Sequence, residues 1–481
     1  MNNIFENKKI TLFVIFIGFF LSVILSINNL NKYDKNLVAE DGTSYHQMIK
    51  GDAYRYLSHG SSIKNQLKND INFFETGRSH FTKYLPPRIA AAYYYFFNLN
   101  LFDELNKKKI NLGIHFPYLL LQSIFYFFSV SVFYLSVSKI FNSRICFYLI
   151  LFLSLEPTIN QYHSSFWSES FLFSFIIILI ALIIRPNPNI GNFFLVGFFL
   201  GIVSLQKEYT IFYIIPIIIY YLIILKDQKL KNITVLLLGF IITQSFLGFN
   251  NLKRSGEFYI LASTTKITLH THLVSHVISE VQNLDDYEFF ENEGKAVLEW
   301  IIKNSISYNQ DSKDLKVRKG LNEYRLLIAN EKDLIKLDNF VTSRTFNYML
   351  QYPLDFTKHI LKKSIHITLL NPFHIYSDNN YISGEIYYTT IEHDKIVPYR
   401  IYYTFLIYLI CIIGFISMIK EKNYNIISFL IISILYFYLP VSWLGNTRNY
   451  VPCLLFIAFF FAFGIDRIHI FIEEIRKNKQ L

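Results

Sequence analysis

Long apolar runs alternate with short polar stretches along most of this chain. The runs 11–27, 171–184 and 212–225 carry no charge, and with their flanks they approach the roughly 20 residues that cross a bilayer. Similar segments recur and are expected at about 10–28, 112–138, 146–160, 170–184, 190–206, 210–225, 232–249, 399–419, 424–442 and 449–466. The pattern therefore predicts an all-α polytopic membrane protein with about ten transmembrane helices.

Composition agrees with this class. Hydrophobic residues make up 52% of the 481 residues and the mean hydropathy is +0.29, which is too apolar for a soluble domain of this size. The first span is long and no small-residue cleavage site follows it, so we expect it to remain as a membrane helix. Because Cys146, Cys411 and Cys453 all fall inside apolar spans, they predict neither a disulfide framework nor a metal cage.

The net charge of +10 reports orientation in the membrane. With the N-terminus inside, the inner segments carry fourteen Lys and Arg against six Asp and Glu, counting Asp466 at the last boundary; these segments are 1–9, 139–145, 185–189, 226–231, 420–423 and 467–481. An excess of basic residues on the cytoplasmic side is the usual bias of membrane proteins. We therefore expect a cytoplasmic N-terminus and no nucleic-acid partner.

This topology places two large polar segments on the outer side. The first contains a short apolar run, 86–102, which begins at Pro86-Pro87 and predicts an interfacial or re-entrant helix. The second is nearly charge-balanced with amphipathic pieces, which predicts a mixed outer domain on the membrane surface. The expected organisation is a first membrane helix at 1–28, a first outer loop at 29–111, a bundle at 112–249, a large outer loop at 250–398, and C-terminal helices with an inner tail at 399–481.

Carboxylates gather on the predicted outer side. Glu40 and Asp41, with Tyr45 close behind, follow the first span, and Glu169 begins another span after the polar turn 156–170. A carboxylate is costly to keep near lipid, so such residues are candidates for a functional site. The simpler alternative is that Asp41 caps a helix and Glu169 interacts with a helix N-terminus.

Isolated cations also occur at the outer ends of predicted spans. They are Lys207, Arg254 and Arg448. Carboxylates can act as general bases, and Lys or Arg can stabilise the charge on a departing phosphate. The combination predicts chemistry on a lipid-linked, phosphate-bearing substrate, although long cations at these positions could also simply reach the interface.

The order of these features resembles that of the GT-C membrane glycosyltransferases, in particular the protein O-mannosyltransferase and aminoarabinose transferase branch. Five features carry the resemblance across residues 10 to 466: the acidic pair with Asp41-x-x-x-Tyr45, Pro86-Pro87, the turn SLEPTINQYHSSFWSESFLF, the span GFFLGIVSLQKEYTIFYIIP, and NNLKRSGEFYILAS with a late Arg448-x-Tyr450-x-Pro452. Two departures are the order Glu40-Asp41, where the family usually has Asp-Glu, and Tyr84-Leu85 before the prolines.

The resemblance implies an inverting transfer of a sugar from a polyprenyl-phosphate donor to a hydroxyl of a lipid, glycan or protein, at the periplasmic face of a bacterial inner membrane. It also implies that Asp41 is the catalytic base, with Glu40 as the alternative. Tyr45, Glu169, Lys207, Arg254 and Arg448 would then bind substrate. No cofactor is required, although a divalent cation could sit between a carboxylate and the donor phosphate.

Two other functions remain open. A surface-polysaccharide polymerase also acts on polyprenyl-linked sugars, but it would have no need for a long first outer loop. A transporter or flippase for lipid-linked glycans often has symmetric halves, which are not seen here. The histidines His270, His272 and His276 are better explained as structural or surface residues than as metal ligands, because no carboxylate of suitable spacing adjoins them.

Overall fold

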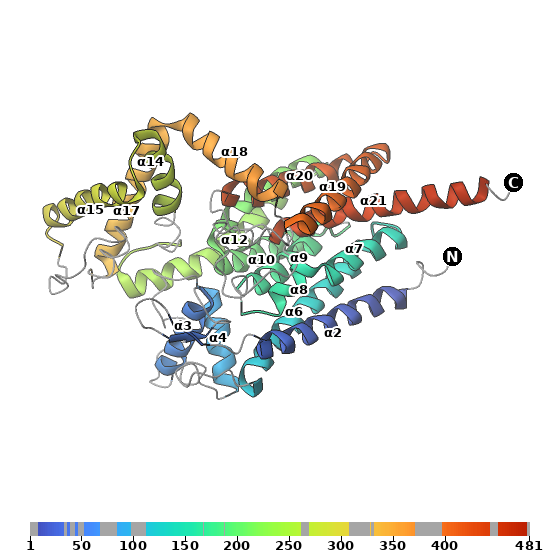
Figure 1. Cartoon of the computed structure of the whole chain (residues 1–481), viewed down its shortest axis with the longest axis horizontal. Coiled ribbons are helices and arrows are strands. Elements are labelled where there is room, and N and C mark those ends of the chain that lie inside the picture. Colours follow the sequence, from blue (N-terminus) through green and yellow to red (C-terminus); the bar gives the residue numbers. More distant parts are fainter. Residues whose placement is uncertain are drawn as a thin grey trace.

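The computed structural model is a helical bundle from one end of which two loop segments emerge (Figure 1). Both termini lie at the opposite end of the bundle. We call these the loop end and the terminal end. The structure describes residues 8–32, 36–38, 44–46, 52–67, 84–97, 112–166, 168–186, 188–260, 269–306, 328, 331–370, 397–442 and 451–478.

The bundle contains twelve helical elements within the described residues. They are α2 (Lys8–Lys32), α6 (Leu112–Val137), α7 (Ser143–Leu155), α8 (Pro157–His163), α9 (Ser168–Ile183), α10 (Ile190–Gln206), η1 (Glu208–Tyr213), α11 (Ile214–Ile224), α12 (Lys229–Ser255), α19 (Val397–Lys420), α20 (Tyr424–Ser442) and α21 (Val451–Asn478).

Five helices in the described part of the chain are long and apolar enough to cross a membrane, and the bent pair α8–α9 would form a sixth span. Shorter apolar helices account for the other predicted spans; they are Ser143–Leu155, Ile190–Gln206, Glu208–Ile224 and Tyr424–Leu439. Each predicted apolar segment is therefore helical, and the predicted all-α membrane fold is confirmed.

Several helices differ from the predicted boundaries. Helix α2 continues to Lys32, α12 runs from Lys229 to Ser255 and so extends into the predicted outer loop, and two further differences are larger. The segment predicted as one span at 146–160 breaks at Glu156, because Pro157 occupies the first turn of α8 and the Glu156 side chain caps that helix. At the C-terminus, α21 continues past residue 466 to Asn478. Its last turns project beyond the neighbouring helices at the terminal end (Figure 1).

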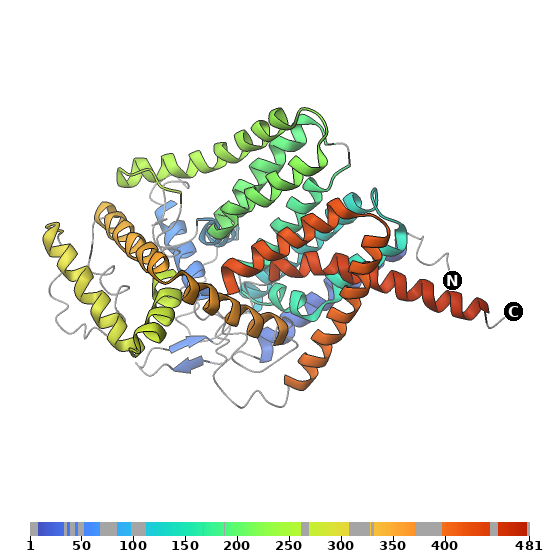
Figure 2. The same cartoon turned by 90° about the horizontal axis from the view of Figure 1, so that it is seen from above.

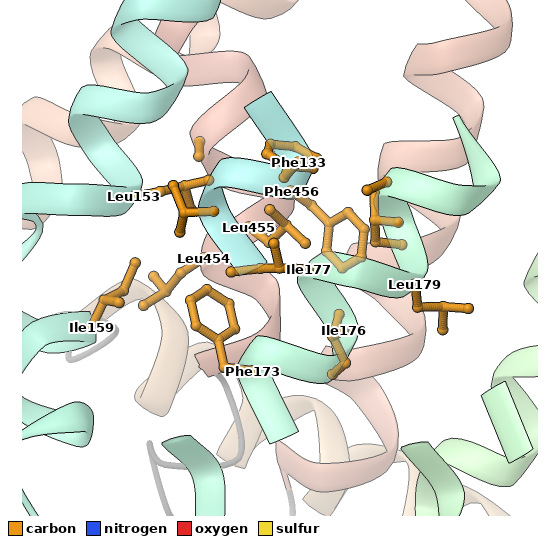
Figure 3. Close-up of a cluster of buried hydrophobic side chains, with 14 of the residues drawn as sticks. Phe133, Leu153, Ile159, Phe173, Ile176, Ile177, Leu179, Leu454, Leu455 and Phe456 are labelled. Atoms are coloured by element: carbon orange, nitrogen blue, oxygen red, sulfur yellow. The ribbon is translucent and has the colours of Figure 1, made fainter. Parts of the chain in front are cut away.

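The core of the bundle forms around α9 and α21. Helix α9 and residues 451–465 of α21 are apolar on almost every side, and a helix without a polar face is expected to be buried. Figure 3 shows Phe173, Ile177 and Leu454 of these helices together with Phe133 of α6 and Leu153 of α7. This packing fixes the helix ends that carry the polar residues described below.

Helices α10 and α12 approach each other closely through glycines. A Cβ on Gly197 would overlap the carbonyl oxygen of Leu236, and one on Gly201 would overlap the side chain of Thr243. On the facing helix, a Cβ on Gly239 would meet the carbonyl oxygen of Phe194. Small residues allow this kind of close backbone contact between membrane helices.

The first loop segment contains two short strands and two helices. Strands β1 (Asn36–Val38) and β2 (Ser44–His46) pair antiparallel, and helices α3 (Asp52–Leu67) and α4 (Leu85–Phe96) pack together. The helix predicted after Pro86-Pro87 is α4.

The second loop segment was predicted to be mixed, but its described parts are helical. They are η2 (Leu269–Val274), a π-helical turn, followed by α14 (Ser275–Gln282), α15 (Asp286–Lys303), α17 (Glu331–Gln351) and α18 (Pro353–Leu370). Figure 2 shows α18 running from α17 back toward the bundle. There it packs against α19 and α20.

Candidate active site

A buried ion pair joins α9 to the end of α10 at the loop end. The Lys207 Nζ atom lies 2.5 Å from Oε1 of Glu169. The two side chains are 3% and 1% exposed, respectively. A pair this deeply buried is costly to desolvate and must be held in place by its surroundings.

The ends of the two helices hold this pair in position. Lys207 is the C-cap of α10 and has extended backbone geometry, so the chain turns there before η1 begins. The preceding residue, Gln206, donates from Nε2 to the carbonyl oxygen of Ser168 at 2.9 Å. Ser168 in turn donates from Oγ to Oε2 of Glu169 at 3.1 Å. Two contacts therefore join the end of α10 to the start of α9: Gln206 with Ser168, and Lys207 with Glu169.

A second group of buried polar side chains lines α8. Glu156, Asn160 and His163 follow each other at helical spacing, so they share one face of α8. Glu156 accepts from the Ile159 backbone N–H at 2.8 Å through Oε2. The ring of His163 stacks on Tyr126 of α6 with centroids 3.7 Å apart, and its Nδ1 atom is 2.7 Å from Oγ of Ser170.

These side chains retain unused hydrogen-bonding capacity. Within the described residues, Glu156 Oε1, Asn160 Oδ1 and His163 Nε2 are buried and have no hydrogen-bond partner. Buried polar atoms are normally satisfied by protein groups or water. The face of α8 can therefore accept hydrogen bonds from water or from hydroxyl groups of a substrate.

Two other helices hold the turn between α8 and α9. Asn29 of α2 donates to Oγ of Ser164 at 2.9 Å, and Gln122 of α6 donates to the carbonyl oxygen of Ser165 at 2.8 Å. Both donors are buried. Sequence reasoning did not identify Asn29 or Gln122. Gln122 lies inside a predicted apolar span, where an amide is a usable signal, whereas Asn29 was placed in the first outer loop.

Arg88 is another functional candidate that sequence reasoning missed. It lies on α4 directly after Pro86-Pro87 and is only 4% exposed. Its guanidinium stacks 3.6 Å from the centroid of the Tyr84 ring and donates to the Tyr84 carbonyl oxygen at 3.0 Å. Because α4 touches α10, this buried cation belongs to the same end of the bundle as Lys207.

Residues 109–248 match the family model of the dolichyl-phosphate-mannose-protein mannosyltransferases. In fold, the chain is similar to the oligosaccharyltransferase AglB from Archaeoglobus fulgidus, solved in complex with an inhibitory peptide and a dolichol-phosphate. The TM-score is 0.50 and the identity 11% over 98% of this chain, which spans about half (51%) of the length of AglB. A comparison with curated proteins gives no match. The fold is therefore similar to that of AglB, and residues 109–248 also resemble the mannosyltransferase family in sequence.

The predicted resemblance to the GT-C enzymes is therefore confirmed. The family match covers the part of the bundle that holds both Glu169 and Lys207. These two predicted site residues are the ones that the structure brings into contact.

The other predicted site residues are less completely described. Glu40, Asp41 and Arg448 lie outside the described residues. Tyr45 is on β2, where it pairs with Leu37 of β1, and Arg254 is in the last turn of α12. The catalytic role of Asp41 and the binding roles of these residues stay predictions.

His270, the first of the three clustered histidines, belongs to a buried hydrogen-bond network in the second loop segment. The buried His270 places Nε2 3.0 Å from Oε2 of Glu293 and Nδ1 2.9 Å from Oγ1 of Thr345. Glu293 also accepts from both Arg344 and Tyr348. Burial by itself would raise the pKa of Glu293, but the hydrogen bonds from Arg344 and His270 outweigh it and lower the pKa to about 2.

Among the described residues, no group of three or more His, Cys, Asp or Glu side chains is arranged to hold a metal ion. What the loop end of the described bundle offers is a buried ion pair, a nearby face of hydrogen-bond acceptors and a buried arginine on α4. These groups suit a substrate that carries both negative charge and hydroxyl groups.

Proposed function

We propose that this protein is an inverting glycosyltransferase that moves a sugar from a polyprenyl-phosphate donor to a hydroxyl acceptor. The observation that carries the proposal is the buried contact between Glu169 and Lys207, which lies within the family match at the loop end of a GT-C fold. Mannosyl transfer from a dolichyl phosphate is what the name of the matched family describes, and AglB was solved with a dolichol-phosphate. Both support a lipid-phosphate-linked donor here.

In the proposed reaction, Asp41 takes the proton from the acceptor hydroxyl as general base. The acceptor oxygen attacks the anomeric carbon and forms the new glycosidic bond. The bond from that carbon to the phosphate oxygen breaks, and polyprenyl phosphate leaves with the electron pair. A single displacement inverts the anomeric configuration.

Cations have a defined part in this reaction. Lys207, held by Glu169, contributes positive charge toward the leaving phosphate, and Arg254 and Arg448 are further candidates. The acceptor atoms on Glu156 and Asn160 would orient hydroxyl groups of the sugar or of the acceptor. A divalent cation could join a carboxylate to the phosphate without being required.

The basic residues of the terminal end support a cytoplasmic location for both termini. The loop end then faces the periplasm of a bacterial inner membrane, where a lipid-linked donor and a lipid, glycan or protein acceptor can meet. The donor chain would approach through the surrounding membrane lipids.

The test is sugar transfer by the full chain in nanodiscs, with polyprenyl-phosphate sugars as donors and short-chain glycolipid or peptide hydroxyls as acceptors. We expect transfer by the wild type and an Asp41→Asn variant that is folded but inactive. Asp227→Asn is the matched control, because Asp227 is exposed in the turn before α12 at the terminal end. Full activity of Asp41→Asn would remove the assigned base.

The acceptor can be identified by mass spectrometry of envelope lipids and glycans from cells with the wild type, a deletion or Asp41→Asn. A loss of the same single-sugar increment in the deletion and in Asp41→Asn supports the proposal. A loss of long-chain polysaccharide that Asp41→Asn restores would instead indicate a polymerase.

A further inference from the structure

The exposed positions of α17 change from polar to apolar along the helix. They recur every three or four residues, so they form one stripe on the outside of the second loop segment. In chain order the stripe contains Lys332, Lys336, Asn339, Ser343, Phe346 and Leu350, and the polar Asn347 and Gln351 are exposed beside its apolar end. The stripe is polar at the start of α17, and its last two residues, Phe346 and Leu350, are apolar.

The apolar stripe continues across the break at Pro353 onto α18. Leu350 is 78% exposed and Leu354, just after the break, is 81% exposed. Leu361, two turns further along α18, is exposed on the same side, because residues seven apart share a helix face. The inner side of α18 holds the buried Phe356 and His359, so the leucines are not part of this segment's core.

This corner is the end of α18 that lies away from the bundle, and the other end of α18 reaches the part of the bundle that faces lipid. Helix α18 runs along the edge of the molecule in Figure 1 and packs against α19 and α20. On its outer side α19 exposes Tyr402, Phe405, Leu409, Ile412 and Ile416, as a membrane-spanning helix does. Helix α18 thus connects the exposed leucines of the α17–α18 corner to the membrane-spanning part of the molecule.

Basic side chains flank the exposed leucines on α18. Lys358 lies between Leu354 and Leu361, and Lys362 follows; both lysines are exposed and outnumber the one exposed acidic residue of this stretch, Asp355. Apolar side chains bordered by lysines are typical of helices that lie at the boundary between headgroups and acyl chains. The positive charge of the lysines is opposite to that of anionic phospholipids, so the two attract each other.

We propose that the α17–α18 corner inserts Leu350, Leu354 and Leu361 into the outer leaflet of the bilayer, with Lys358 and Lys362 at the headgroups. The second loop segment is then held against the membrane at this corner and through α18. The start of α17 stays in water. This inference does not depend on the proposed reaction.

The test uses an environment-sensitive fluorophore on single introduced cysteines, Leu354→Cys and Lys336→Cys, in the full chain. The protein is placed one copy per nanodisc of phosphatidylethanolamine and phosphatidylglycerol, with nitroxide-labelled acyl chains as quencher. We expect the label at 354 to be blue-shifted and quenched at least roughly twofold more than the label at 336. Labelled wild type corrects for reaction at the three native cysteines.

Leu409→Cys on α19 is the membrane-exposed reference, and its label should be quenched at least as strongly as the one at 354. A label at 354 that is no more quenched than the one at 336 would overturn the proposal. A label at 354 that is blue-shifted but not quenched by nitroxide lipids would overturn it as well, because protein would then cover the leucines.

Discussion

Lys207 and Glu169 lie 38 positions apart in the sequence, yet their side chains meet at 2.5 Å in the interior of the loop end. One residue ends α10 and the other begins α9. Lys207 thus has two possible roles: it stabilises the fold through this ion pair, and it is a candidate for binding the donor phosphate. The two roles can be separated experimentally.

We expect Lys207→Met to destabilise the protein by about 3–5 kcal/mol, because it leaves the Glu169 carboxylate buried without its counter-charge. The double variant Lys207→Met/Glu169→Leu removes both charges and should recover most of the lost stability. If Lys207 serves the reaction, the double variant should remain inactive. Thermal unfolding in detergent and sugar transfer in nanodiscs measure the two effects.

The matched control for this pair is Lys295→Met on α15. Lys295 contacts Glu291 at 2.7 Å, but both side chains are exposed. An exposed ion pair contributes little, so the unfolding temperature and the activity should not change. Recovery of activity together with stability in the double variant would show that Lys207 has a structural role alone.

Gly197→Leu should prevent the close packing of α10 on α12. The new side chain would overlap the Leu236 carbonyl, and backbone atoms cannot move aside cheaply. We expect little folded protein by size-exclusion chromatography. Gly191→Ala, on the first turn of the same helix, meets only the Asn189 side chain at 3.5 Å and should fold normally.

A double-mutant cycle between Arg88 and Tyr84 should give a coupling energy of about 1–2 kcal/mol, because the guanidinium stacks on the ring away from water. The variants are Arg88→Lys, Tyr84→Leu and their combination, and the measurement is thermal unfolding. A coupling near zero would mean that the stacked geometry contributes nothing to stability.

The second loop segment should lose stability in acid through Glu293. Its pKa is lowered from 4.5 to about 2, so its ionised form stabilises the fold above the unfolded pKa. That contribution, about 3 kcal/mol, is fully present above about pH 5 and is lost as the pH falls toward 2. Hydrogen exchange of α15 and α17 across this range measures it.

Glu293→Gln is the variant for this prediction. It should be less stable than the wild type at neutral pH, and its α15 and α17 should respond less to acid. Glu291→Gln, an exposed change on the same helix, should keep the acid response of the wild type. An unchanged acid response in Glu293→Gln would assign the effect to other groups.

The sequence predicted the helices of the bundle well, because an uncharged apolar run of sufficient length has few alternatives in a membrane protein. It did not predict the break at Glu156. Glu156 and Pro157 are good signals for the start of a helix, but the apolar run in which they lie was read as continuous.

The sequence also identified Glu169 and Lys207 as separate candidates but could not predict that they pair. Their contact depends on how α9 and α10 pack, which is set by side chains distributed over several helices. Arg88 was missed because the apolar run around it was read only as an interfacial helix. Charged residues at a site differ from other charged residues in their burial and their depth in the membrane, and neither can be read from residue type alone.

The glycine contacts between α10 and α12 also set a fixed length scale. Gly201 lies against Thr243, and at 1.5 Å per residue Lys207 is roughly 9 Å beyond that level and Arg254 roughly 16 Å. The backbones of the two cations are therefore offset by roughly 7 Å along the paired helices. Because closely packed helices resist sliding, we expect this axial offset between the two backbones to stay constant.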